Sequence, residues 1–133
     1  MGNDAGKLIL RLAVGALMAF HGLSKLRHGV AWMAGPLSAH HLPAALAYGV
    51  YVAEVVAPVF LIVGIFTRPA GLVIAFEMVV ATYLVLGAGA FTLDKQTGAL
   101  KSELQFLYML GGLAIAFLGS GRYALSKGKG RWD

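Results

Sequence analysis

Residues 11–25 read RLAVGALMAFHGLSK, and this stretch decides the fold. It is apolar enough to enter a bilayer, yet it carries Arg11, His21 and Lys25. On a helix that turns about 100° per residue, these three side chains fall within roughly 80° of one another. Because a charge in hydrocarbon costs at least about 3 kcal/mol, the polar face has to be covered by other helices of the chain.

The composition of the whole chain also indicates a membrane protein. Of its 133 residues, 59% are hydrophobic and 13% are charged, whereas a soluble domain is about 25% charged. The net charge of +5 comes from Lys and Arg at the ends of apolar runs, which indicates membrane topology rather than a nucleic-acid surface. There is no cysteine, so the chain alone supplies no thiol and no ligand for an iron–sulfur cluster. It also has no nucleotide-binding motif.

Four apolar runs predict an all-α fold, a transmembrane four-helix bundle that forms one domain over residues 1–133. A span needs about 20 apolar residues. An interfacial segment is expected between the first two helices, because Pro36 and Pro43 break that stretch. Pro58 should free one backbone carbonyl in the second helix and bend it. The expected spans are 7–26, 44–66, 70–90 and 103–120, followed by a basic tail at 121–133.

The distribution of Lys and Arg predicts the orientation. Four spans place both termini on the same side of the membrane. That side would collect seven basic residues and the other side four, so the positive-inside rule predicts cytoplasmic termini and the inner membrane of a prokaryote. The seven are Lys7, Arg11, Arg68, Arg122, Lys127, Lys129 and Arg131, and the four are Lys25, Arg27, Lys95 and Lys101.

Charged residues inside the spans form the candidate site. Glu54 and Glu77 are the only charges of the second and third helices, and each needs a partner because lipid cannot solvate it. Depths estimated from a rise of about 1.5 Å per residue predict a polar column within the bundle. The expected pairs are Arg11 with Glu77, Glu54 with His21 or Arg11, and Glu103 with Lys25.

Two interpretations of this column stay open. The charges could simply fix the register of the helices. Alternatively, they could line a cavity for a small ligand with a polar head, or a proton path, formed by His21, Glu54, Glu103, Tyr51 and Tyr108. The adjacent His40 and His41 are weaker candidates for a metal site, because neighbouring residues on a helix diverge by about 100° and loop histidines are usually just solvated.

The order and spacing of these motifs resemble the DoxX family of small four-helix membrane proteins, over about residues 8–126. The resemblance starts with RLAVG at 11–15 and HGLSKL at 21–26. It continues through Glu54, GIFTR at 64–68, Glu103 at the start of the last helix and GRY at 121–123.

The resemblance implies a redox-associated membrane protein. The namesake of the family is associated with a thiosulfate:quinone oxidoreductase as a small membrane subunit, and other members are linked to redox homeostasis or sulfur metabolism. We therefore expect a quinone-like or other small ligand in the polar cavity, with a partner subunit that brings the redox centre. The alternatives are a non-catalytic subunit or scaffold of a larger complex, a homo-oligomer, or a small proton-coupled transporter.

Overall fold

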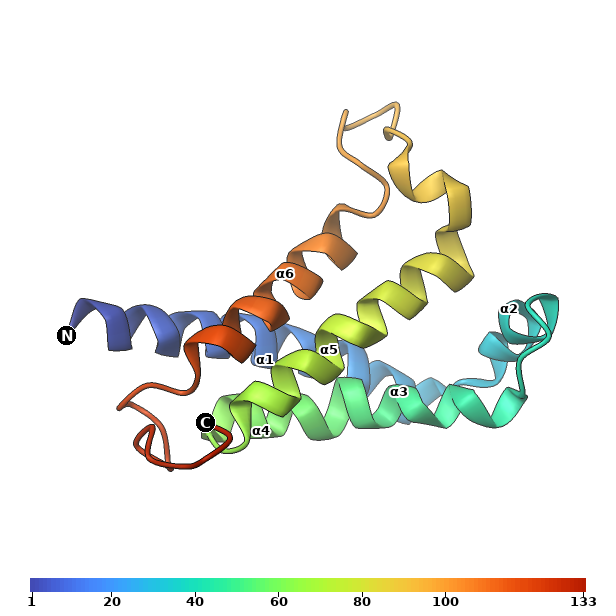
Figure 1. Cartoon of the computed structure of the whole chain (residues 1–133). Helices are drawn as coiled ribbons and strands as arrows, with labels where there is room; N and C mark the ends of the chain where they lie inside the picture. The colour runs from blue at the N-terminus through green and yellow to red at the C-terminus, as the bar shows by residue number, and fades with distance from the viewer.

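The computed structural model describes all residues 1–133, and the chain is built from helices (Figure 1). Three helical stretches are long and apolar enough to cross a membrane, namely α1 (Gly2–His28), Ala44–Val63 and Thr67–Phe91. A fourth apolar helix, α6 (Glu103–Leu118), is shorter. The predicted all-α class is confirmed, with three rather than four helices of full spanning length.

The segment after α1 is packed against the helices at the end of the molecule away from the termini (Figure 1). It contains η1 (Ala31–Met33), a single 3₁₀ turn, and the short α2 (Ala34–Ala39). Leu37 of α2 is buried and joins a small cluster with Val30, Ala47 and Leu84. This cluster holds the segment over the ends of the long helices.

The second long stretch changes its winding at a proline. It consists of η2 (Ala44–Tyr48), α3 (Gly49–Tyr51), η3 (Val52–Val56) and α4 (Ala57–Val63). Pro58 has no N–H to donate to the carbonyl of Glu54, four residues earlier. The backbone N–H of Ala57 instead reaches the carbonyl of Val52, five residues earlier, and η3 becomes a π-helix. The helix is therefore widened at Glu54 rather than broken.

The third stretch also contains a π-helical turn. It runs through α5 (Thr67–Ala81), the π-helix η4 (Thr82–Leu86) and the 3₁₀ segment η5 (Gly87–Phe91). A tight turn joins it to α4, and this turn uses left-handed backbone at Gly64, with φ of 82°. Helix α1, Gly2–His28, exceeds its expected span of 7–26 at both ends, and α5 begins at Thr67 rather than at residue 70.

The helices are arranged as two antiparallel pairs. In Figure 1, α1 lies along α3 and α4, and the pair of α5 and α6 crosses them obliquely. Glycines set the closest approaches: a Cβ on Gly71 would overlap the carbonyl oxygen of Gly112, and one on Gly22 would overlap that of Glu54. The core between the pairs contains Val14, Met18, Ala57, Leu61, Ala70, Ile74, Met78, Tyr108 and Ile115.

The outer surfaces of the helices are apolar. Phe20, Phe76 and Phe117 are 69%, 70% and 80% exposed, respectively. Exposed aromatic and aliphatic side chains on every long helix leave a surface that a bilayer would cover. The two termini share one end of the molecule, where the backbone N–H of Arg122 donates to Asp4 Oδ1 at 3.2 Å.

Candidate functional site

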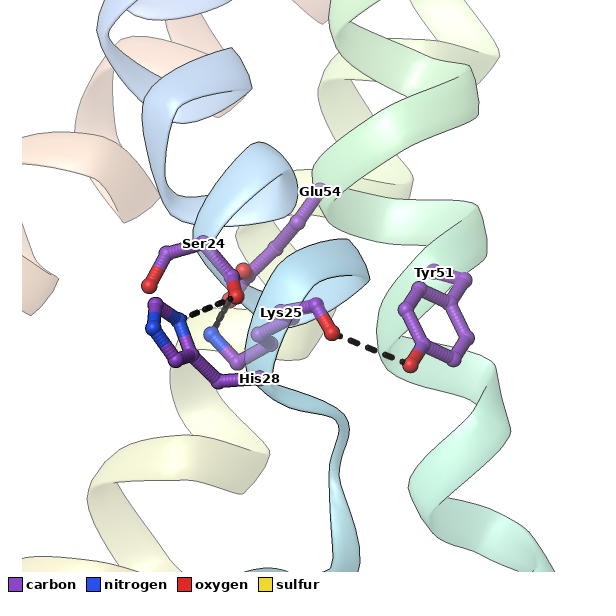
Figure 2. A network of polar contacts seen from close by, with 5 residues as sticks. All are labelled: Ser24, Lys25, His28, Tyr51 and Glu54. Carbon is purple, nitrogen blue, oxygen red and sulfur yellow. Dashed lines mark hydrogen bonds and ion pairs between the residues drawn. The ribbon is translucent and has the colours of Figure 1, made fainter.

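An ion pair joins the last turn of α1 to η3 (Figure 2). Lys25 Nζ donates to Glu54 Oε1 at 2.7 Å and to Oε2 at 2.5 Å. Glu54 is buried, and the Lys25 side chain is mostly buried. The pair forms because Gly22, one turn before Lys25, lets α1 approach the backbone of η3 at Glu54. The prediction that Glu54 pairs with His21 or Arg11 is therefore wrong.

The last turn of α1 is held by side chains around this ion pair. Tyr51 Oη donates to the carbonyl of Lys25 at 3.2 Å, and His28 Nδ1 lies 3.0 Å from the carbonyl of Ser24 (Figure 2). The carbonyl of Lys25 also accepts from the backbone N–H of Gly29 at 2.7 Å, so these side chains add second contacts to the last turn of α1. Tyr51 therefore contacts the backbone of Lys25 and does not line the cavity described below.

Arg11 does not meet Glu77, so this predicted pair is also wrong. Arg11 is fully buried, and its guanidinium donates to the carbonyl of Leu61 at 2.5 Å and to that of Tyr123 at 2.6 Å. These carbonyls lie in the last turn of α4 and in the tail. A helix C-terminus carries unpaired carbonyls and a partial negative charge, and that is what Arg11 neutralises.

Glu77 lies instead beside the ion pair. Its side chain, from α5, lines the same cavity as Lys25 and Glu54, close enough to interact electrostatically with both. One oxygen, Oε2, is buried and has no hydrogen-bond partner. Helices α1, η3 and α5 thus bring one ammonium and two carboxyl groups to the same place.

Glu103 is not part of this cluster, and its predicted pairing with Lys25 is wrong. It is exposed in the first turn of α6. A carboxylate in that position is stabilised by the N-terminus of its own helix. Estimating depth along straight helices missed this, because α6 starts only after the loop at 92–102 has left the bundle (Figure 1).

A cavity of about 580 Å³ opens beside Lys25 and Glu54. Its wall is mostly apolar and comes from α1, the interfacial segment, η3, α5, η4 and α6. Cavities of this kind, with a few convergent polar groups, are typical of small-molecule sites. The polar side chains that line it are His21, Lys25, Glu54, Glu77, Gln105 and Tyr108.

Two of these residues meet across the cavity wall. Tyr108 of α6 is buried, and its ring stands edge-on to that of His21 with centroids 5.8 Å apart. Gln105, three residues earlier on α6, has a buried Oε1 without a hydrogen-bond partner. Gln105 lines the cavity but was not among the predicted site residues, because an uncharged amide in a helix gives no signal of its own. Trp32, in the segment after α1, also lines the cavity.

The two loop histidines do not come together as a metal site. His40 Nδ1 lies 2.9 Å from the carbonyl of Pro36, and its ring packs against Tyr83. His41 is exposed at the end of the turn. No group of three histidine, aspartate or glutamate side chains is close enough to hold a metal ion.

Long apolar helices around a buried ionic cluster define a small integral membrane protein of the α-helical class. The family model described as DoxX matches residues 6–87, the part that carries α1, the Lys25–Glu54 pair and Glu77. The chain belongs to the DoxX family, and the resemblance seen in the sequence is confirmed.

A relative in Haemophilus influenzae, described as "Uncharacterized protein", is similar over more of the chain. It is 34% identical over 118 residues, which cover 87% of this chain and 84% of the relative. Such coverage extends past residue 87, so the likeness includes α6. No solved structure matches the chain.

Proposed function

We propose that this DoxX protein binds a quinone-like molecule in the cavity between its helices and takes part in a membrane redox process. The ion pair of Lys25 and Glu54, with Glu77 beside it, in the wall of an otherwise apolar cavity supports this proposal most strongly. A quinone has the matching shape, with a polar ring and an apolar tail. Its electrons would be exchanged with a partner redox subunit, since cofactors carry such chemistry.

The polar groups of the cavity suit the head of such a ligand. Lys25 Nζ has three N–H donors and uses two on the oxygens of Glu54. The third is left to donate to a quinone carbonyl, and the Tyr108 hydroxyl is a second donor on the opposite wall. The volume of about 580 Å³ lies within the range of about 300–1,000 Å³ found for small-ligand sites.

The same proposal includes a four-helix bundle in the inner membrane with both termini in the cytoplasm. The contact between Asp4 and the backbone of Arg122 supports a common side for the termini, which also carries most of the basic residues. Helix α6, about 24 Å long at 1.5 Å per residue, would be the fourth span. The cavity would then lie in the outer half of the membrane.

Thermal unfolding of the purified protein in mild detergent tests ligand binding. A short-chain benzoquinone and its hydroquinone are added separately, since a ligand that binds only the folded state raises the unfolding temperature. We expect at least one of them to stabilise the wild type. The shift should be largely lost in Glu54→Gln.

Glu103→Gln is the matched control, because it removes the same charge from an exposed position outside the cavity. It should keep the ligand-induced shift of the wild type. The unfolding temperatures without ligand show whether each variant is folded. The proposal fails if neither compound stabilises the wild type and extracts of the purified protein contain no quinone.

A further inference from the structure

The charges around Glu54 do not balance. Two carboxyl groups, Glu54 and Glu77, line the same cavity as a single ammonium, that of Lys25. Arg11, the nearest buried cation along α1, is occupied by backbone carbonyls. The other titratable groups facing Glu77 across the cavity are His21 of α1 and Tyr108 of α6, and neither forms an ion pair with it.

The carboxyl groups of Glu54 and Glu77 also lack one hydrogen-bond donor. Lys25 donates to both oxygens of Glu54, whereas Glu77 Oε2 is buried without a partner. A second carboxylate next to the first, with one oxygen buried, would be repelled by it and would have no counter-charge of its own. A proton on the carboxyl pair removes the excess charge and supplies the missing donor between the two groups.

We propose that Glu54 and Glu77 together hold one exchangeable proton, with Lys25 as the fixed counter-charge, as a proton-binding site within the membrane. The site belongs to the pair, because a proton on either carboxyl leaves the other to balance Lys25. This inference goes beyond ligand binding and depends only on the three side chains.

A polar pocket gives this proton a route to water. It has a volume of about 240 Å³, enough for several water molecules at about 30 Å³ each. It adjoins the large cavity, with which it shares His21, Lys25 and Trp32. The pocket lies at the last turn of α1, so the proton exchanges with the side of the membrane opposite to the termini. Its lining is His21, Ser24, Lys25, His28, Gly29 and Trp32.

Infrared spectroscopy of the protein in an ester-free detergent, without added quinone, tests the proton site. A protonated carboxylic acid has a carbonyl band separate from those of carboxylates, and this band shifts in D₂O. The remaining acids, Asp4, Asp94, Glu103 and Asp133, lie outside the cavity, so the variants below distinguish their signals from that of the carboxyl pair. The wild type should therefore show the band at neutral pH, and Glu103→Gln should retain it.

Three variants make the test specific. In Glu77→Gln and in Glu54→Gln the band should disappear, because Lys25 then balances the one carboxylate that is left. In Lys25→Met the band should grow about twofold, since both carboxyl groups then need a proton. Circular dichroism and unfolding temperature identify any variant that is misfolded. The bands of the folded variants then test the proton site.

The proton site is refuted if folded wild-type protein shows no carboxylic-acid band at neutral pH. It is equally refuted if the band persists unchanged in both Glu→Gln variants. Because no quinone is present, either result leaves the proposed ligand site standing.

Discussion

The two ends of the bundle use buried cations in opposite ways. At the end with the termini, Arg11 donates to the carbonyls of Leu61 and Tyr123 and has no carboxylate partner. At the other end, Lys25 binds the carboxylate of Glu54 beside a cavity. One cation completes a helix end, whereas the other meets a titratable side chain in the wall of a cavity.

Arg68 extends the pattern at the terminal end. Its Nη1 donates to the carbonyls of Ala116 and Phe117 at 2.8 and 2.9 Å, and its Nε donates to the carbonyl of Asp133 at 2.9 Å. Two arginines thus cap the C-terminal turns of α4 and α6, where carbonyls have no partner within the helix. The comparison teaches that a charge inside a membrane protein is structural when the backbone satisfies it. It becomes a candidate for function when its partner is another titratable side chain next to a cavity.

The largest effect should follow substitution of Arg11, the buried cation at the end with the termini. Arg11→Met leaves the carbonyls of Leu61 and Tyr123 without a buried donor, and hydrogen bonds to charged groups contribute about 1.5–3 kcal/mol each. We expect the protein to accumulate poorly in the membrane, or to unfold at a much lower temperature. Arg27→Met, at an exposed position of the same helix, should behave like the wild type. Normal accumulation and stability of Arg11→Met would show that the capping contacts are dispensable.

The next largest effect should come from separating α1 and η3. In Gly22→Ala the new methyl group would overlap the carbonyl oxygen of Glu54, so the two helices must move apart, at a cost of about 1–3 kcal/mol. We expect a lower unfolding temperature and loss of the quinone-induced shift. Gly6→Ala, on the same helix with open space around it, is the matched control. Equal quinone binding by both variants would show that the ligand site does not need the close approach of α1 to η3.

Removal of both partners of the ion pair should have a smaller effect on stability. Replacing a buried pair by uncharged groups is often neutral, whereas removal of one partner leaves an uncompensated charge. We therefore expect Lys25→Met with Glu54→Gln to unfold within about 1 kcal/mol of the wild type while losing quinone binding. Chemical unfolding combined with quinone titration separates the two effects. If the double variant still bound quinone, the ion pair would not be part of the ligand site.

The smallest effect should come from the loop at 92–102. The backbone N–H groups of Thr97 and Gln96 donate to Asp94 Oδ1 and lower the pKa of Asp94 below its ordinary value of 3.8. Because the pKa of Asp94 is lowered in the folded state, its carboxylate stabilises the turn at pH values above the ordinary pKa. This stabilisation is lost as the pH falls through the lowered pKa.

Amide hydrogen exchange checks this turn locally. Protection factors of Gln96 and Thr97 should decrease on acidification below about pH 4 in the wild type, and should not depend on pH in Asp94→Asn. Protection in the wild type that is the same at neutral and acidic pH would contradict the role of the carboxylate.

Much of the fold was readable from the sequence, because apolar runs of spanning length report directly on helices in a membrane. Helix faces and depths predicted a polar column inside the bundle that includes His21, Lys25, Glu54 and Glu77, and these four line one cavity. The individual pairs did not follow, because depth along an ideal helix says nothing about backbone acceptors. Arg11 was assigned to a carboxylate, although the carbonyl of Leu61 was available.

The π-helix at Glu54 was also beyond prediction. The sequence showed that Pro58 would free a carbonyl, but the response of the backbone depends on packing against α1. There Gly22 contacts the backbone of Glu54, and η3 keeps the helix continuous with five-residue hydrogen bonding. Such turns are frequent at functional sites, and this one carries the buried carboxylate.

Tryptophan fluorescence tests the difference between the two ends most directly, because each end has one tryptophan. Trp32 lines the cavity, and Trp132 is exposed in the tail at the terminal end. Quinones quench tryptophan, so Trp132→Phe reports on the cavity alone and Trp32→Phe on the tail alone. We expect saturable quenching of Trp32, abolished by Glu54→Gln, and only non-saturable collisional quenching of Trp132. Equal, non-saturable quenching of both tryptophans would contradict a ligand site at the Lys25 end of the bundle.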